Sequence, residues 1–243
     1  MTLIVAAVQS NVALLAADTR TSVMEWDAAE ENFRPREFVD GQDDKFLPVA
    51  NGWLAGTPLA VYKHFWPTGV HRQSLPATIA EASRAVLDTA PSRNTAAFLA
   101  EAFRRQRFFH IGAWSHGLHG QVFDSSGTTV ETLDNRCEIS VPWAPDWTRY
   151  GPLEAIRKVY VSRIASDDVA AVLRATGWLF GAVRDRCGPQ GSISDHVEVR
   201  YIEWAADGQA VFRRIGPTPW YALAGVAPTA EPFSREVLAG VAA

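Results

Sequence analysis

Cysteine is scarce in this sequence, and long apolar runs are missing. Cys137 and Cys187 are far apart and form no Cys-x-x-Cys pair. That excludes a disulfide framework and a paired-thiol metal or redox motif, so we expect two reduced thiols. No apolar run approaches the roughly 18 residues that cross a bilayer, and the N-terminus lacks the basic segment of a secretory signal. We therefore expect a cytoplasmic protein with no membrane partner.

An excess of positive charge is also missing. Lys and Arg total 23 against 27 Asp and Glu, and the net charge is −4. This balance lacks the basic footprint of a nucleic-acid-binding protein. The 243 residues, 47% of them hydrophobic, suffice for one domain with a full core. We expect a single domain over residues 1–243, with its core at about 2–215 and a C-terminal extension at 216–243.

The pattern of apolar residues predicts alternating groups of strands and helices. Strands are expected at 3–8, 12–17, 107–115, 119–124, 128–133, 194–204 and 209–215, with a hairpin at 45–57. Helices are expected at 76–89, 95–105, 152–163 and 167–185. Residues 23–44 contain eight acids and two bases and are interpreted as a solvated loop, and 137–150 as an irregular segment. Because the helices come in consecutive pairs, the order favours antiparallel sheets flanked by helix layers.

The first two strands begin almost at the first residue. A three-residue loop at 9–11 would place Val8 opposite Val12 and Thr2 opposite Asp18, on one face of the hairpin. Thr2 is small enough for Met1 to be removed, which would leave a threonine with a free α-amine. Such an amine has a pKa of about 7.7–8.0, so a hydroxyl nucleophile and a base would share one residue.

The motifs of the chain resemble those of proteasome β-subunits and their bacterial relatives, the N-terminal threonine hydrolases. The segment "TLIVAAVQSNVALLAADTRTS" is similar to the opening of that family, including its "ADxR" at 17–20. "DDKFLPV" offers the lysine of the family, "WLAGT" its Ala-Gly turn, and "HIGAWSHGLHGQVFDSSGT" its strand pair. The segment that starts "YGPLEAIRKVY" and ends "HVEVRYI" resembles the close of the family pattern. The resemblance covers about residues 2–205 and implies a four-layer αββα sandwich.

The resemblance also implies a role for each matching residue. Thr2 would be the nucleophile, with its own α-amine as the base. Lys45 would hold a positive charge near the hydroxyl, and Asp18 would orient Lys45. The Gly56 N–H would face the developing oxyanion, and Asp185 would help to fix the N-terminal residue. The substrate-binding residues implied are Ser22 and Thr57. No cofactor and no metal are implied.

The family assembles into rings, so the resemblance implies a homo-oligomeric ring that acts on peptides or unfolded proteins. It leaves the unfoldase partner open. The sequence departs from the family pattern in a longer acidic segment before Lys45, in "APDWTRYG" at 144–151, and in Gly188 where the family has a serine. Two alternatives stay open on the same fold: a small-molecule amidase, and a ring-forming subunit without catalysis.

Three other features allow competing interpretations. "AWSHG" resembles a nucleophile elbow, with Ser115 as nucleophile and His196 downstream, but the strand predicted after it does not fit the strand–turn–helix that this motif needs. A metal site is conceivable at His110, His116 and His119, but two of them are expected in a turn, and we favour the interpretation as surface histidines. Candidate interface residues in irregular segments are Trp143, Trp147 and Trp220.

Overall fold

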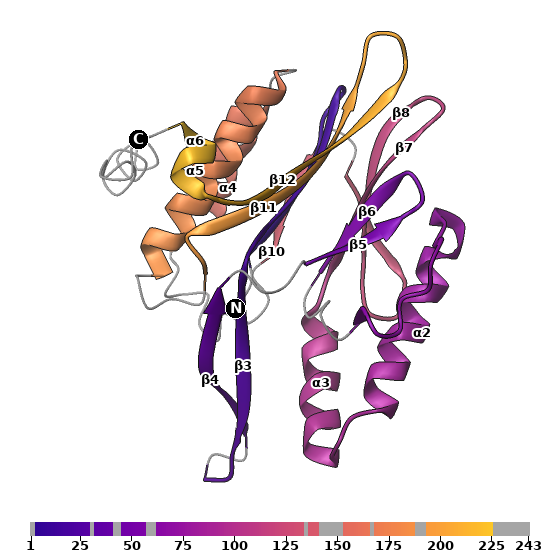
Figure 1. Cartoon of the computed structure of the whole chain (residues 1–243), viewed down its shortest axis with the longest axis vertical. Coiled ribbons are helices and arrows are strands. Elements are labelled where there is room, and N and C mark those ends of the chain that lie inside the picture. Colours follow the sequence, from indigo (N-terminus) through magenta and orange to yellow (C-terminus); the bar gives the residue numbers. More distant parts are fainter. Residues whose placement is uncertain are drawn as a thin grey trace.

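The protein forms a sandwich of two five-stranded antiparallel sheets between helix layers (Figure 1). The structure is a computed structural model that describes residues 3–29, 32–40, 45–56, 62–133, 136–140, 153–165, 168–187 and 193–225. Helices lie on the outer face of each sheet, and the inner faces of the two sheets pack against each other. The αββα architecture expected from the sequence is confirmed.

The first sheet has the strand order β10-β1-β2-β11-β12. Its strands are β1 (Ile4–Val8), β2 (Val12–Asp18), β10 (Arg136–Ser140), β11 (His196–Trp204) and β12 (Ala210–Pro219). Every residue of β1 and β2 is buried. These strands are covered on both faces, which explains why their sequences are apolar throughout instead of alternating.

The second sheet has the strand order β5-β6-β7-β8-β9. Its strands are β5 (Phe46–Val49), β6 (Gly52–Ala55), β7 (Phe108–Trp114), β8 (Gly117–Phe123) and β9 (Thr129–Thr132). The β5–β6 hairpin turns where the sequence predicts it, and Asn51 adopts a positive φ of 60° there. Asparagine tolerates that conformation better than most residues, which suits it to this tight turn.

The helices cover the two outer faces. The second sheet is covered by α2 (Leu75–Asp88), preceded by the short η1 (Arg72–Ser74), and by α3 (Arg93–Arg105). The first sheet is covered by α4 (Leu153–Ile164), α5 (Val169–Cys187) and the short α6 (Trp220–Ala224). All four predicted longer helices are present, within two residues of their expected limits. In the described part of the chain, no helix is long and apolar enough to span a membrane.

Three apolar cores separate the four layers. Leu3, Val5 and Ala7 face α4 and α5, whereas the intervening residues of β1 face the second sheet. A third core fills the space between the second sheet and the helices α2 and α3. Alternate residues of one strand thus contribute to two different cores, as the pleat requires.

The register of the first hairpin differs from the prediction. Val8 pairs with Ala13 and not with Val12, which sets Ile4 opposite Ala17. As a result, Asp18 lies opposite Leu3 and donates its backbone N–H to the Leu3 carbonyl at 3.1 Å. Both faces of these strands are apolar and buried, so a shift of one position exposes nothing and the hydrophobic pattern does not specify the register.

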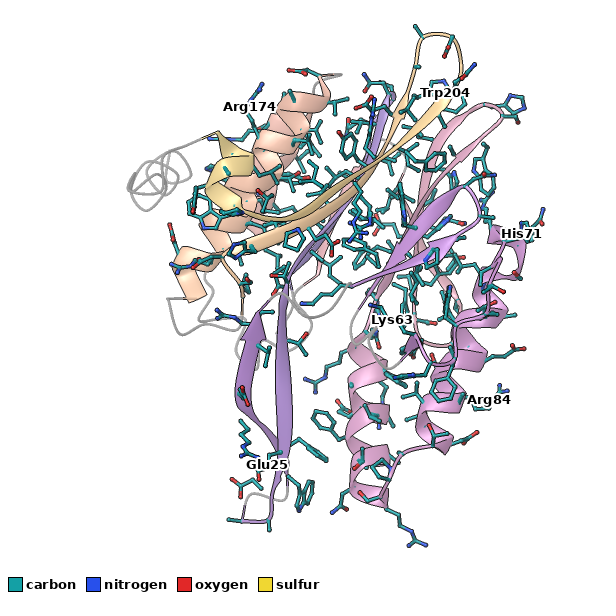
Figure 2. The ribbon with its side chains drawn as sticks, in the orientation of Figure 1. Glu25, Lys63, His71, Arg84, Arg174 and Trp204 are labelled. Carbon is teal, nitrogen blue, oxygen red and sulfur yellow. The ribbon has the colours of Figure 1, made fainter. Side chains whose placement is uncertain are left out.

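The prediction of an acidic loop at residues 23–44 is wrong for the described part of that segment. It forms a two-stranded hairpin of β3 (Arg20–Asp27) and β4 (Asn32–Asp40), which extends beside α3 (Figure 1). The ring centroids of Trp26 and Phe33 lie 5.2 Å apart, and those of Phe33 and Phe98 on α3 lie 4.5 Å apart. These few aromatic residues pack the hairpin against the helix, and the acidic composition of the segment gave no indication of that contact. Figure 2 marks Glu25 near the far end of the hairpin.

Two smaller expectations are also corrected. Residues 136–140 form β10, the strand beside β1, although the sequence indicated an irregular segment from 137 onward. Trp220 was expected at a subunit interface, but it is buried in the core against α5, where the Gly181 backbone approaches its ring closely. Trp143 and Trp147 lie outside the described residues.

Candidate functional site

Asp18 is the centre of a buried polar cluster at one end of the sandwich. Its side chain lies at the end of β2 and is 1% exposed. Its Oδ1 accepts the Leu3 N–H at 2.8 Å, and its Oδ2 accepts the Arg20 N–H at 3.1 Å. The first contact places the carboxylate directly beside the start of the chain.

Lys45 reaches Asp18 from the other sheet. Its Nζ lies 3.1 Å from Asp18 Oδ1 and donates a second hydrogen bond to the Arg20 carbonyl at 2.7 Å. The lysine is 7% exposed, so the pair is shielded from water on both sides. Burying two charges carries a desolvation cost that their attraction repays only with good geometry and additional hydrogen bonds, both of which are present. The structure therefore brings together the carboxylate and the lysine that the sequence paired.

Gly56 lies next to Lys45 across the β5–β6 hairpin. Phe46 pairs with Ala55, so continuing the register by one position sets Lys45 opposite Gly56. A Cβ at Gly56 would stand 2.7 Å from Cδ1 of Phe108. Only glycine fits this position without displacing the ring, which explains the Ala-Gly sequence at the end of β6.

Thr19 and Ser194 belong to the same cluster, and the sequence reasoning missed both. The Thr19 hydroxyl donates to Ser194 Oγ at 3.1 Å, and the Ser194 N–H lies 3.5 Å from Asp18 Oδ2. Both residues are at most 2% exposed. The available signal was the strand predicted at 194–204. In an antiparallel pair, the first residue of one strand lies near the last residue of the other, so Ser194 would lie near the end of its partner strand. The missing information was that this strand pairs with β2.

Asp185 was expected to fix the N-terminal residue. It lies on α5 with a side chain that is 35% exposed, 3.9 Å from the Arg184 guanidinium. Burial raises the pKa of Asp185, Arg184 opposes that rise, and the neighbouring Asp195 carboxylate adds to it. Arg184 itself binds Asp195, with Nη2 donating to Oδ2 at 3.2 Å. Arg184, rather than Asp185, therefore makes the described contact with the segment that carries Ser194.

Three predicted residues lie wholly or partly outside the described structure. Thr2 and Thr57 are not described. The backbone of Ser22 lies on β3, paired with Phe38, and its side chain is not described. The nucleophile and the substrate-binding residues therefore stay predictions.

The competing sites have different surroundings. Ser115 lies in the tight turn between β7 and β8, so a strand follows it where an elbow needs a helix. His110 and His119 are buried on β7 and β8, 1% and 7% exposed, which corrects their interpretation as surface histidines; His116 is exposed in the turn. Among the described residues, no group of three or more His, Cys, Asp or Glu side chains could hold a metal ion.

Comparison with known proteins shows likeness to solved structures but not to any known sequence family. No protein-family model and no curated protein matches the chain. Among solved structures, the chain is similar to the Gly-1 mutant of Anbu from Hyphomicrobium sp. strain MC1, with a TM-score of 0.49 and 17% identity. The match covers 93% of each chain.

Proposed function

We propose that this protein is an N-terminal threonine hydrolase that cleaves peptide amide bonds. The observation that carries the proposal is the buried Asp18–Lys45 pair, whose carboxylate also accepts the Leu3 N–H. That contact holds the lysine-bound carboxylate against Leu3, the residue that follows Thr2 in the sequence. A positive charge beside a hydroxyl favours its deprotonated form, as nucleophilic attack requires.

In the proposed reaction, removal of Met1 frees the α-amine of Thr2. The amine accepts the proton of the Thr2 hydroxyl while Oγ attacks the carbonyl carbon of the amide. The proton then passes to the leaving amine, and water hydrolyses the resulting ester to restore the threonine. Lys45 stabilises negative charge at Oγ, and Asp18 keeps the ammonium in place.

The Gly56 N–H is the proposed donor to the oxyanion of the tetrahedral intermediate. Its position across the hairpin from Lys45 supports this role, because donor and lysine would then lie at one end of the sheet. One such donor contributes about 3 kcal/mol to transition-state stabilisation. Ser22 on β3 and Thr57, directly after Gly56, would hold the substrate backbone. Asp185 is proposed to act on the N-terminal residue from α5.

Burial of the ion pair also favours catalysis over a purely structural role. Replacing a buried pair with apolar side chains is often neutral or stabilising, so a scaffold alone has no need for it. A ring-forming subunit without catalysis would gain nothing from a lysine held against a carboxylate beside the N-terminus. A homo-oligomeric ring is proposed as the assembly, and peptides or unfolded chains as the substrates.

Processing and labelling test the chemistry. The purified protein should have a mass that lacks Met1, and a threonine-directed electrophile such as a peptide epoxyketone should add once per chain. Thr2→Ala should abolish labelling and hydrolysis of short peptide amides, whereas Ser115→Ala should leave both unchanged. Active protein that retains Met1, or a Thr2→Ala variant with wild-type activity, would rule out this mechanism.

Light scattering at micromolar concentration separates the remaining alternatives. A ring that hydrolyses peptides is the expected result. A strict monomer that hydrolyses only small amides would favour the small-molecule amidase. A ring that is inert to peptides and to the electrophile would favour the structural subunit.

A further inference from the structure

We propose that Thr19 and Ser194 are positioning residues for the Asp18–Lys45 pair. Their hydroxyl groups form a buried pair that locks the end of β2 to the residues just before β11. This inference rests on the proposed function and names the residues that would hold its charged pair in the reactive geometry. Neither residue is expected to touch the substrate.

Ser194 makes the hydrogen bonds that connect the end of β2 to the start of β11. Its Oγ accepts the Thr19 hydroxyl at 3.1 Å and the His196 N–H at 3.0 Å, while its own N–H lies 3.5 Å from Asp18 Oδ2. The Thr19 N–H donates to the His196 carbonyl at 3.2 Å. Thr19 is thus joined to His196 at the start of β11 through its backbone and to Ser194 through its side chain.

The segment that carries Ser194 is itself anchored at each neighbouring residue. Ile193 is buried in the core beneath α4 and α5. The Asp195 carbonyl accepts the Trp220 N–H at 3.0 Å, and its carboxylate binds Arg184 of α5. Because three different elements hold this short segment, it can act as a rigid support for the Asp18 carboxylate.

A rigid support matters because the two Asp18 oxygens have different partners. Oδ1 accepts from Leu3 and Lys45, whereas Oδ2 accepts from Arg20 and lies beside the Ser194 N–H. Rotation of the carboxylate would weaken its contact with Lys45. Loss of the hydrogen bond between Thr19 and Ser194 should therefore lower the reactivity of the nucleophile by displacing Asp18 and Lys45. No group that contacts the substrate would change.

The chain offers a matched control for the alternative that the hydroxyl pair only stabilises the fold. Thr176 on α5 is fully buried and pairs with the Tyr160 hydroxyl, also at 3.1 Å. Its pair lies in the core between the first sheet and its helices, on the side of that sheet that faces away from Lys45. Thr19→Val and Thr176→Val both replace a buried hydroxyl with a methyl group of similar size.

The experiment compares wild type, Thr19→Val, Thr19→Ser and Thr176→Val. Labelling of Thr2 by the electrophile is followed over a range of pH, and melting temperature is measured in parallel. Thr19→Val should label roughly tenfold or more slowly, with its rate profile shifted to higher pH, because a misplaced charge supports deprotonation less well. Thr19→Ser should restore both rate and profile. Thr176→Val should lower the melting temperature without slowing the labelling.

A second measurement does not depend on activity. The sequence has three lysines, and the other two, Lys63 and Lys158, are exposed, so isotope-labelled lysine gives a resolvable Lys45 ε-methylene signal. That signal should move in Thr19→Val and stay unchanged in Thr176→Val. Wild-type labelling rates in Thr19→Val, or equal slowing in both valine variants, would overturn the positioning role. Should the wild-type protein not react at all, the proposed function fails, and the Lys45 signal alone decides the inference.

Discussion

Two buried polar clusters in this molecule solve the same physical problem differently. Around Asp18, a carboxylate and a lysine are both buried, and each has several hydrogen-bond partners. Around His110, two imidazole rings are buried with centroids 5.2 Å apart, and no ring nitrogen of His110 or His119 has a hydrogen-bond partner in the part of the chain that the structure describes. One cluster keeps its charges because they are paired, and the other buries its groups in the neutral form.

The histidine cluster lies on the outer face of the second sheet. The ring of His119 stacks on Trp114 at 4.0 Å, and the Arg72 guanidinium lies 4.2 Å from the centroid of that same indole. Burial, reinforced by the Arg72 charge, lowers the pKa of His110 to about 3. Burial, with smaller effects of His110 and Arg72, lowers the pKa of His119 to about 3. A second cation beside Arg72 is therefore strongly disfavoured.

The difference shows that this protein buries an ionised group where partners surround it and keeps a buried group neutral where they do not. A neutral imidazole can fill space in a core, so the histidine cluster needs only to stay unprotonated. An ionised pair needs every contact that surrounds Asp18, and the chain supplies them from both sheets. These hydrogen bonds and the ion pair beside Leu3 make the Asp18 cluster the candidate for chemistry. Four predictions test the contrast.

Removing Lys45 should have the largest effect. Lys45→Met leaves the Asp18 carboxylate buried without its cation, and the loss of a partner from such a pair costs about 3–5 kcal/mol of unfolding free energy. Lys63→Met, at an exposed lysine, should stay within about 0.5 kcal/mol of wild type. Urea unfolding measures both. Equal stability of the two variants would mean that the buried Asp18 carboxylate does not depend on the positive charge of Lys45.

Acid should destabilise the protein through the histidine cluster. In the unfolded chain, histidine has a pKa of about 6.5, well above the folded value of about 3. Below pH 6.5 the two histidines bind protons in the unfolded state, whereas in the folded state they stay neutral until the pH approaches 3. Their contribution to the free energy of unfolding is therefore fully present above pH 6.5 and is lost as the pH falls toward 3. Between pH 7.5 and 5.0, each histidine should account for roughly 2 kcal/mol.

Single variants assign this pH dependence. His110→Leu and His119→Leu should each flatten the pH profile of the urea midpoint. His116→Leu, in the exposed turn between the same strands, should leave the profile as in wild type. If all three variants kept the wild-type slope, protonation of the buried pair would not be its cause.

A methyl group at Gly56 should cost less. Gly56→Ala sets a Cβ against the Phe108 ring, and overpacking of this kind destabilises by about 1–3 kcal/mol. Gly216→Ala is the control, because a Cβ there meets no atom within 4 Å. Thermal unfolding of both variants measures how rigidly the Lys45 end of the sheet is packed. A neutral Gly56→Ala would show that this end is looser than the structure implies.

The smallest effect is expected at the β3–β4 hairpin. Phe98→Ala removes the ring that contacts Phe33 and should cost about 0.5–1.5 kcal/mol. Hydrogen exchange of the backbone amides of β3 and β4 should become faster, while exchange in β1 and β2 stays slow. Uniformly faster exchange would mean that the aromatic contact supports the whole fold and not only the hairpin.

Much of the fold follows from local patterns. The helices α2, α3, α4 and α5 were predictable because their apolar residues recur at helical spacing over many residues. The hairpins at Asn51 and Gly208 were predictable because their turn residues tolerate positive φ, which both adopt. Pairing Asp18 with Lys45 came from a family resemblance, since nothing local connects residues so far apart in the chain.

Other features depend on contacts that no local pattern contains. The β3–β4 hairpin is held by three aromatic rings, one each from β3, β4 and α3, although the composition of residues 23–44 is dominated by charge. His110 and His119 are buried where Arg72 of η1 lies over Trp114, the ring on which His119 stacks, and a turn-rich sequence does not reveal such a contact. Thr19 and Ser194 meet only because β2 pairs with β11.

The sequence by itself determined antiparallel sheets flanked by helices, because apolar periodicity and turn residues act over short distances; the four-layer order was what the family resemblance implied. Only the tertiary structure decided which atoms surround Asp18. Its partners come from the residue before β1, from β3, from the residue before β5 and from the segment just before β11. The register that aligns them was free to shift by one position as long as both faces stayed apolar. That register is set by packing on both faces and by buried hydrogen bonds that form only when the two sheets meet.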